Sequence, residues 1–200
     1  SDLKESHMTS ITPIPVDPRL APNARALFDA LHAASGAFAM FGHQDDTFCR
    51  HTAEADSDIL AVAGAYPAVW GFDMGRVELG WNENIDHIPF DDIRREMRRA
   101  HDLGAVITLS WHSVNPITEG GYGDNMAADT VEAVLPGGAL HEKYLGWLGA
   151  VADFLTSVAD SDGEPIPIVF RPYHEHTGDW FWWCTGSPAR PTDTTPEQFV

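Results

Sequence analysis

The sequence contains few basic residues. Twelve lysines and arginines stand against thirty aspartates and glutamates, and the formal net charge is −18. Nucleic acids and anionic membrane surfaces attract proteins through clusters of positive charge. The balance of charge therefore argues against both as partners, whereas a neutral ligand is compatible with it.

Cysteine is equally scarce, since the chain has only Cys49 and Cys184. Two cysteines are too few for a disulfide framework, and they lie too far apart in the sequence for a zinc ribbon. We favour two free thiols, and a single disulfide between them is the alternative.

Long apolar runs are absent too, because no stretch approaches the roughly eighteen continuous apolar residues of a membrane-spanning helix. The start of the chain, SDLKESHMTS, is polar and does not resemble a signal peptide, and we interpret residues 1–8 as an expression scar. A secreted protein cloned without its leader begins in the same way. A secreted or periplasmic location with the signal peptide removed is therefore favoured, and a cytoplasmic location is the alternative.

The residues that are present are typical of a globular domain. The chain has 200 residues, of which 44% are hydrophobic, enough for one domain with a sizeable core. Apolar spacing and terminal residues predict helices over 23–35, 54–64, 90–104 and 141–160. Short apolar runs predict strands over 36–44, 67–75, 105–112 and 167–175, and residues 113–139 are expected to form a long glycine-rich loop.

The predicted strands and helices alternate, and the strands are apolar along their length, as in a parallel sheet covered on both faces. Polar residues gather where the four strands end: His43, Gln44 and Asp45; Asp73; His112; His174 and Glu175. The carboxyl edge of a parallel sheet is where α/β proteins bind ligands. The alternative is that these residues only mark the beginnings of loops.

Four β/α units make half of a (β/α)8 barrel, a fold that usually needs about 250 residues. We expect residues 9–35 to form an N-terminal extension with the first helix, and residues 36–200 to form the N-terminal half of a barrel in a longer protein. The last residues, TTPEQFV, are expected to begin a further helix. A smaller α/β fold is the alternative.

The segment RPYHEHTGDWFWWC, residues 171–184, places a single glutamate, Glu175, just before a block of aromatic side chains. It resembles the acid/base segment of glycoside hydrolase family 26, the β-mannanase family of the retaining (β/α)8 clan. FGHQDD (41–46), WGFDMG (70–75) and SWHSVNP (110–116) are similar to strand-end motifs of that family, in the same order. The resemblance implies a TIM barrel and a retaining endo-β-1,4-mannanase that cleaves mannan, glucomannan or galactomannan.

Glu175 is the expected general acid and base. Glycoside hydrolysis needs one carboxyl group to protonate the leaving oxygen and a second to attack the sugar or to activate water. The proton donor needs a pKa near neutral, and we expect an apolar, partly dry wall of Trp180, Phe181, Trp182 and Trp183 to raise it. The resemblance places the nucleophilic glutamate at the end of a seventh strand, beyond residue 200.

The roles of the remaining site residues are inferred mainly from the resemblance to the family. The predicted substrate-binding residues are His174, His112, Trp180, Trp183, Asp73 and His43. His174 and His112 are expected to contact the same sugar, which stacks on Trp180. Since neighbours on an ideal strand point to opposite faces, His174 and Glu175 share one site only if the strand twists or bulges there.

Two residues are predicted to support the site. Arg171 lies on the same strand face as Glu175, and we expect it to pair with Asp73 inside the barrel. Asn115 is expected to shape the loop after the third strand, since asparagine before proline favours a turn. A purely structural role is the alternative for Arg171.

Other functions remain open. One is another β-glycanase of the same family: a mannobiose-releasing exo-enzyme, a lichenase or a β-1,3-xylanase. Another is a non-catalytic carbohydrate-binding protein. The residues His43, Asp45, Asp46 and His51 invite a metal site, but HQDD lacks the HxH pair of metal-dependent barrels, so we predict no catalytic metal and no cofactor. The expected partner is a β-mannan oligosaccharide or polysaccharide, and the expected state is a monomer.

Overall fold

The computed structural model describes residues 13–51 and 56–186. The chain divides into two compact units, Ser1–Ala39 and Met40–Val200. In the first unit, α1 (Pro22–Ala34) begins with a proline, which suits the first turn of a helix. An ion pair between Arg25 and Asp29 spans 3.0 Å on its surface. The expected expression scar and the expected helix start at TTPEQFV lie outside the described residues.

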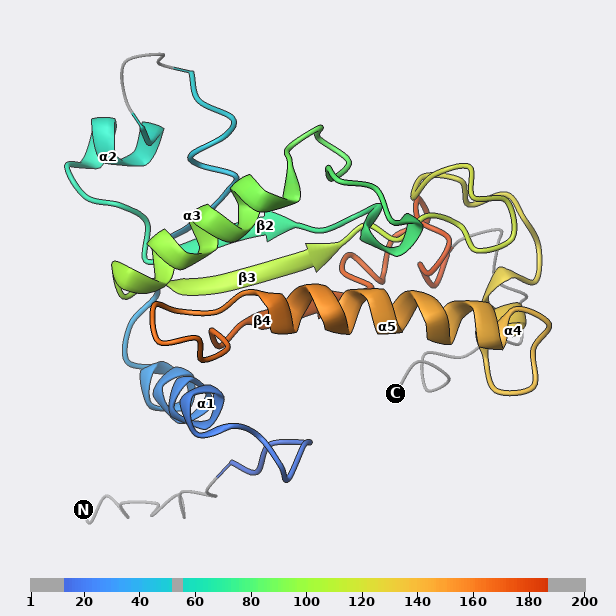
Figure 1. The fold of residues 1–200 in the computed structure, drawn as a ribbon, viewed down its shortest axis with the longest axis horizontal. Coiled ribbons are helices and arrows are strands. Elements are labelled where there is room, and N and C mark those ends of the chain that lie inside the picture. The colour runs from blue at the N-terminus through green and yellow to red at the C-terminus, as the bar shows by residue number, and fades with distance from the viewer. Residues whose placement is uncertain (1–12, 52–55, 187–200) are drawn as a thin grey trace, which may run out of the picture. The chain divides into compact units, whose positions relative to one another are not determined.

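The second unit is built on a parallel sheet of four strands. These are β1 (Gly42–Gln44), β2 (Val69–Asp73), β3 (Val106–Trp111) and β4 (Val169–Pro172), in that spatial order. The three longest of the described helices between them are α2 (Asp58–Ala63), α3 (Phe90–Asp102) and α5 (His141–Ser157), as Figure 1 shows. The predicted alternation of parallel strands and helices is confirmed.

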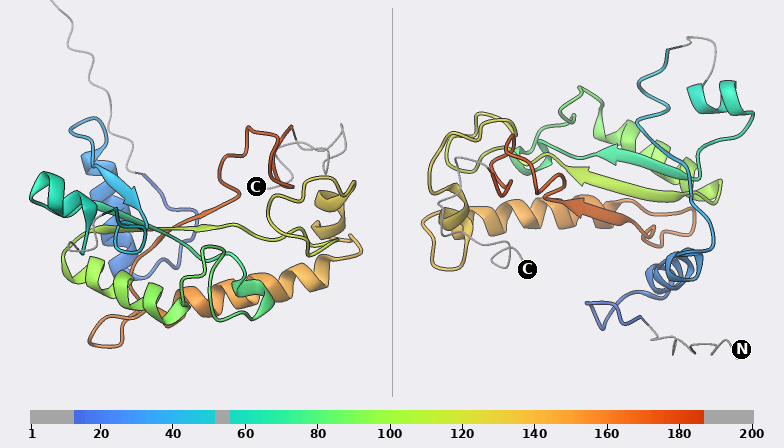
Figure 2. Two further views of the ribbon diagram at one scale, coloured as in Figure 1. Left: turned by 90° about the horizontal axis from the view of Figure 1, so that it is seen from above. Right: turned by 180° about the vertical axis from the view of Figure 1, so that it is seen from behind.

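The two faces of the sheet differ in chemistry. One face carries the buried side chains Trp70, Phe72, Ile107, Leu109 and Trp111, and α3 and α5 lie on that side of the sheet (Figure 2). On the opposite face, the register aligns Gly71 with Thr108 and Ser110 with Arg171. Because successive strand residues point to opposite faces, β2 and β3 alternate large apolar residues with small or polar ones. The prediction of strands apolar along their whole length is therefore corrected.

Local signals fix the helix ends. Ser57 begins α2, and its Oγ accepts a hydrogen bond of 2.9 Å from the backbone N–H of Leu60. Gly64 ends the same helix in the left-handed conformation, as the sequence predicts. Asp91 and Asp92 lie in the first turn of α3, where the helix dipole favours negative charge.

Several predicted segments differ from the observed ones. The strand predicted over 36–44 is limited to Gly42–Gln44, and the helix predicted over 54–64 begins at Asp58. The loop expected over 113–139 contains a short helix, α4 (Thr130–Val134). Its Val131 and Val134 are three residues apart, so they share one helix face, and both are buried. The fourth strand ends at Pro172 and not at Glu175. Residues 173–175 therefore belong to the turn after the strand.

Both cysteines are free, as predicted, with Cys49 exposed and Cys184 buried. The thiol of Cys184 points to the carbonyl oxygen of Glu175 at 3.3 Å. Among the described residues, no helix combines the length and the apolar character that crossing a membrane requires.

Candidate active site

The carboxyl ends of β2, β3 and β4 bring polar residues together at one edge of the sheet. Asp73 ends β2, His112 directly follows β3, and His174 lies two residues after β4. The segment after β4 lies beside the loop after β3 in both Figure 1 and Figure 2. The structure therefore joins three of the predicted site residues from three different strands.

A row of hydrogen bonds connects these residues. Asp73 Oδ2 lies 2.7 Å from His112 Nδ1, and His112 Nε2 lies 3.0 Å from His174 Nε2. The Asp73 carboxylate also accepts from Ser110 Oγ at 2.8 Å and from the backbone N–H of Gly75 at 2.7 Å. Asp73 is only 2% exposed, so it offers almost no surface to a sugar. The burial of Asp73 argues against the expectation that it binds substrate directly, and its hydrogen bond to His112 gives it a supporting position.

The turn after β4 explains how neighbouring residues reach one site. Tyr173 and Glu175 both have positive φ, at 52° and 56°, a conformation that is uncommon outside glycine and costs about 1–3 kcal/mol. The chain is therefore not extended at these positions, and the alternation of an ideal strand does not apply. The hydroxyl of Tyr173 is held 2.6 Å from that of Tyr144, which helps to fix the strained turn.

Glu175 is exposed and is paired with one indole. The N–H of Trp180 donates a hydrogen bond of 2.7 Å to Glu175 Oε2. Trp180 is 49% exposed, so its ring offers an apolar surface beside the carboxyl group. The expected dry wall of four aromatic residues is corrected: one indole contacts Glu175, and the described residues do not enclose the carboxyl group.

The other aromatic residues of this segment belong to the core. Trp182 and Trp183 are 0% exposed. The indole N–H of Trp182 donates to the carbonyl of Ser113 at 3.1 Å, and that of Trp183 donates to the carbonyl of His174 at 2.9 Å. Because the buried ring of Trp183 has no free face, the prediction that it binds substrate is revised to a supporting role. It holds the backbone next to Glu175.

The two predicted supporting residues have different surroundings. Asn115 is fully buried, and its amide donates to the carbonyl of Asp124 at 2.8 Å and to Thr130 Oγ1 at 3.2 Å. Asn115 thus ties the loop after β3 to the start of α4. Arg171 is exposed on the polar face of the sheet. Among the described ion pairs, Asp73 pairs with His112 and not with Arg171, which corrects the expected partner.

His43 does not join the other histidines. The register pairs it with Trp70, so it lies on the apolar face of the sheet, opposite Gln44 and Gly71. Its Nδ1 lies 2.9 Å from the carbonyl of Gln44. The expectation that His43 binds substrate with His112 and His174 is revised on this ground.

Residues in the loop after β1 form hydrogen bonds to the start of α2. Asp46 bonds to the hydroxyl of Ser57 and accepts from the backbone N–H of Ile59 at 3.3 Å, while His51 Nδ1 lies 3.0 Å from Asp58 Oδ2. Within residues 13–51 and 56–186, no group of three or more histidine, cysteine or acidic side chains is placed to hold a metal ion.

Sequence reasoning missed Glu78, which lies in the 3-10 helix Val77–Leu79 after β2. Glu78 is buried and accepts from the indole N–H of Trp111 and the backbone N–H of Val114, each at 2.9 Å. Burial raises the pKa of Glu78. Its contacts fix the chain on both sides of His112. An acidic residue between two apolar ones, bounded by Gly80, was the available signal.

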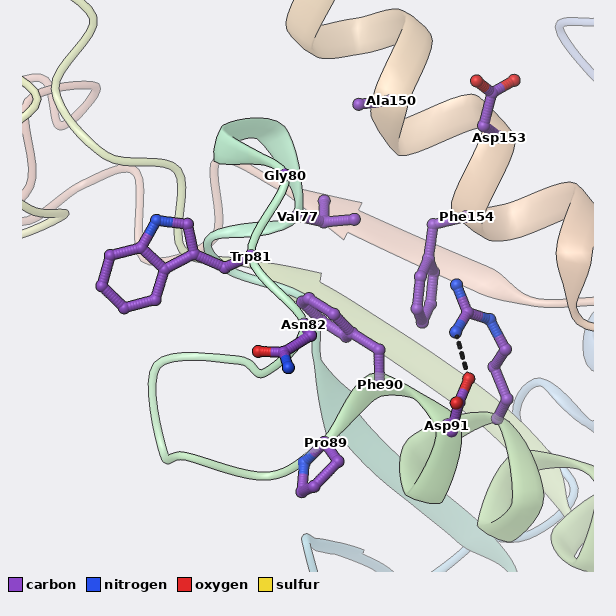
Figure 3. Close-up of a pocket in the computed structure, with 11 residues that line it drawn as sticks. Val77, Gly80, Trp81, Asn82, Pro89, Phe90, Asp91, Ala150, Asp153 and Phe154 are labelled. Atoms are coloured by element: carbon purple, nitrogen blue, oxygen red, sulfur yellow. Dashed lines mark hydrogen bonds and ion pairs between the residues drawn. The ribbon is translucent and has the colours of Figure 1, made fainter.

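A separate groove lies between the loop after β2 and the helices α3 and α5. It encloses about 450 Å³, and its walls include Trp81, Asn82, Asp91, Arg94 and Asp153 (Figure 3). None of the predicted site residues lines it. The groove is therefore separate from the cluster of Asp73, His112 and His174 at the carboxyl edge of the sheet.

Asp45 is a buried carboxyl group at the end of β1. It is 5% exposed, its Oδ2 accepts from the Gln44 amide at 3.1 Å, and its Oδ1 has no hydrogen-bond partner among the described residues. The pKa of Asp45 is raised from 3.8 to about 6, mainly by burial, with the Gln44 hydrogen bond lowering it and nearby Asp86 and Asp73 adding to the rise. The folded chain therefore binds the Asp45 proton more tightly than the unfolded chain.

This difference predicts a pH dependence of stability. Asp45 stabilises the fold fully below pH 3.8, and this contribution falls as the pH rises through about 6. The total change is about 3 kcal/mol, from a pKa shift of about two units. Relative to wild type, Asp45→Asn should become more stable between pH 4 and pH 7, as measured by urea unfolding. Asp153→Asn, an exposed control, should show the wild-type slope, and an equal slope in Asp45→Asn would contradict the assignment.

The fold and the site together indicate a class of protein. An exposed glutamate at the carboxyl edge of a parallel β/α sheet, bonded to an exposed tryptophan, is compatible with a glycoside hydrolase, a class that needs carboxyl groups where the sugar binds. The chain belongs to glycosyl hydrolase family 26, since the model of that family matches residues 16–199.

Known proteins with similar sequences are mannanases. A mannan endo-1,4-β-mannosidase of Bifidobacterium adolescentis is 33% identical over 175 residues, which cover 84% of this chain and 17% of that protein. One from Bacillus subtilis strain 168 is 32% identical over 153 residues, covering 74% of this chain and 39% of that protein. The chain thus spans less than half the length of these two relatives.

A solved structure shows the same fold. The β-mannanase of this family from Bacteroides ovatus is 39% identical and superposes with a TM-score of 0.81, covering 90% of this chain and 52% of that chain. A modular endo-β-1,4-mannanase from Cellulomonas fimi is 35% identical with a TM-score of 0.70, covering 82% and 38%. The four parallel strands and the helices between them therefore match part of the family's TIM barrel.

Proposed function

We propose that this chain is the N-terminal half of the catalytic barrel of a retaining endo-β-1,4-mannanase. The observation that carries the proposal is the pair formed by Glu175 and Trp180, in which the indole N–H contacts the carboxyl group at 2.7 Å. The two related mannan endo-1,4-β-mannosidases support the choice of sugar. The substrate would be mannan, glucomannan or galactomannan.

Glu175 would act first as an acid and then as a base. It would protonate the oxygen between two sugars as that bond breaks, and would later take a proton from the water that releases the product. The nucleophilic glutamate would lie beyond residue 200, because the resemblance places it on a seventh strand and the described part of this chain contains four strands. No described carboxylate is assigned to that role.

The neighbours of Glu175 would position the sugar. The exposed ring of Trp180 would stack on the apolar C–H face of the sugar at the cleavage point. His112 and His174, whose rings lie 4.4 Å apart by their centroids, would line the polar side of the same subsite. Tyr122 and Phe181 pack edge-on against His112 and keep its ring in place.

The substrate and the stereochemistry are tested on the full-length protein. We expect release of reducing ends from mannan, glucomannan and galactomannan faster than from lichenan or β-1,3-xylan. Proton NMR of the first product should show the β-anomer, because two displacements at one carbon retain its configuration. The α-anomer as first product, or faster cleavage of another glycan, would overturn the proposal. Binding of mannan without cleavage would identify a carbohydrate-binding protein instead.

A further inference from the structure

The hydrogen bonds of Asp73 fix the proton position on His112. Asp73 Oδ1 accepts from the backbone N–H of Gly75, and Oδ2 accepts from Ser110 Oγ. An ionised carboxylate can only accept hydrogen bonds. His112 Nδ1, at 2.7 Å from Oδ2, must therefore carry a proton. In a neutral imidazole the other nitrogen, Nε2, is then a bare acceptor.

The second histidine follows from the first. His174 Nε2 lies 3.0 Å from His112 Nε2, and two nitrogens at this distance share one proton. A proton on His174 Nδ1 would be a buried N–H group without a partner among the described residues, so the single proton of a neutral His174 lies on Nε2, which donates to His112 Nε2. His174 Nδ1 is then left without a proton. It is buried and has no hydrogen-bond partner among the described residues, which suits a bare lone pair better than an orphaned N–H group.

His174 is also held neutral by its surroundings. Burial lowers the pKa of His174, and any positive charge on neighbouring His112 would lower it further. Arg171 acts in the same direction, whereas Asp73 and Glu175 act in the opposite one. A neutral ring agrees with the single proton that the geometry assigns to it.

We propose that Asp73 is a positioning residue that sets the tautomers of two histidines in series, placing the proton of His112 on Nδ1 and that of His174 on Nε2. The N–H group of His112 then donates to Asp73, and that of His174 donates to His112. The consequence for catalysis rests on the proposed function. A neutral His174 adds no positive charge beside Glu175, and a positive charge there would favour the ionised form of the acid that must donate a proton.

Asp73→Asn should reverse the donor and acceptor in both hydrogen bonds, the one between residue 73 and His112 and the one between His112 and His174. The backbone N–H of Gly75 needs an acceptor, so the amide oxygen of asparagine should take the place of Oδ1. The amide nitrogen then replaces Oδ2 and faces His112 Nδ1 as a donor. Ser110 Oγ can turn its proton to the carbonyl of Phe72, which lies 3.2 Å away. His112 must then carry its proton on Nε2, and His174 must carry its proton on Nδ1.

The test is a ring-nitrogen NMR spectrum of the full-length protein labelled with ¹⁵N-histidine. Signals are assigned with His112→Gln and His174→Gln. Wild type should show His112 protonated on Nδ1 and His174 on Nε2, and Asp73→Asn should show the reverse for both rings. Ser110→Ala and Asp153→Asn should keep the wild-type pattern, because neither changes the acceptor that faces His112.

Two results would overturn the proposal. One is a wild-type His174 protonated on Nδ1, and the other is a folded Asp73→Asn protein with unchanged tautomers. The wild-type spectrum decides the first point even if Asp73→Asn does not fold. Because the measurement needs no substrate, its outcome is independent of whether the protein cleaves mannan.

Discussion

Replacing Glu175 with alanine in the full-length protein should lower kcat/KM on polymeric mannan by roughly a thousandfold, the middle of the range for a lost general acid. The sugar alkoxide that leaves during cleavage is a poor leaving group without a proton. Aryl β-mannosides with good leaving groups do not need that proton, so their first step should slow far less. The measurements are kcat/KM on mannan and on an activated aryl β-mannoside, since kcat/KM reports the first step and not the later release of the product.

The control for this prediction is Glu142→Ala. Glu142 is an exposed acid in the first turn of α5, and its loss should leave both rates near the wild-type values. Glu175 is also exposed, and its replacement leaves no buried partner unsatisfied, because the Trp180 indole N–H can bond to water. A loss of activity in Glu175→Ala therefore reports chemistry and not unfolding. Mannan cleavage within tenfold of wild type would remove Glu175 from the mechanism.

The order of the fold could be predicted because its signals are local. Apolar runs mark β2 and β3, Gly64 ends α2, and the acidic first turn of α3 marks its beginning. None of these signals depends on distant parts of the chain. The same local reading placed Asp73, His112 and His174 at the carboxyl edge, because parallel strands all end on that side.

The partners of the site residues could not be predicted in the same way. Neighbouring strand residues point to opposite faces, so the face of a side chain depends on the exact register. His43 pairs with Trp70 and lies on the apolar face, whereas Gln44 lies on the other face. Asp73 meets His112 and not Arg171 because β2 pairs with β3, while Arg171 lies one strand further, on β4. The turn after Pro172 has positive φ angles at Tyr173 and Glu175, neither of which is a glycine. The sequence therefore carries no local sign of this turn.

Composition also fails to separate the tryptophans of residues 180–183. Trp180 is half-exposed, whereas Trp182 and Trp183 are completely buried. The sequence shows three indoles in four positions, but only the packing of the turn against Ser113 and Tyr144 decides which ring faces solvent. This difference leads to two opposite experimental outcomes within one segment.

Trp182→Ala should destabilise the fold by about 3–5 kcal/mol, the usual cost of removing a buried aromatic side chain. The ring contacts Tyr144, Tyr173 and Trp183, and its N–H satisfies the buried carbonyl of Ser113. Urea unfolding measures the change. If Trp182→Ala does not fold, Trp182→Phe keeps most of the apolar contact but leaves that carbonyl unpaired, which should cost about 1–3 kcal/mol.

Trp180→Ala should lose activity but little stability, the reverse of what we expect for residue 182. Because about half of its surface is already exposed, its free energy of unfolding should change by less than about 1 kcal/mol. On mannan, kcat/KM should fall roughly tenfold or more, which corresponds to a loss of about 1.4 kcal/mol of interaction with the sugar. A folded Trp182→Phe protein should keep kcat/KM within a few fold of wild type. Equal losses of activity in the two variants would mean that Trp180 acts through the core, and the stacking surface beside Glu175 would have to be abandoned.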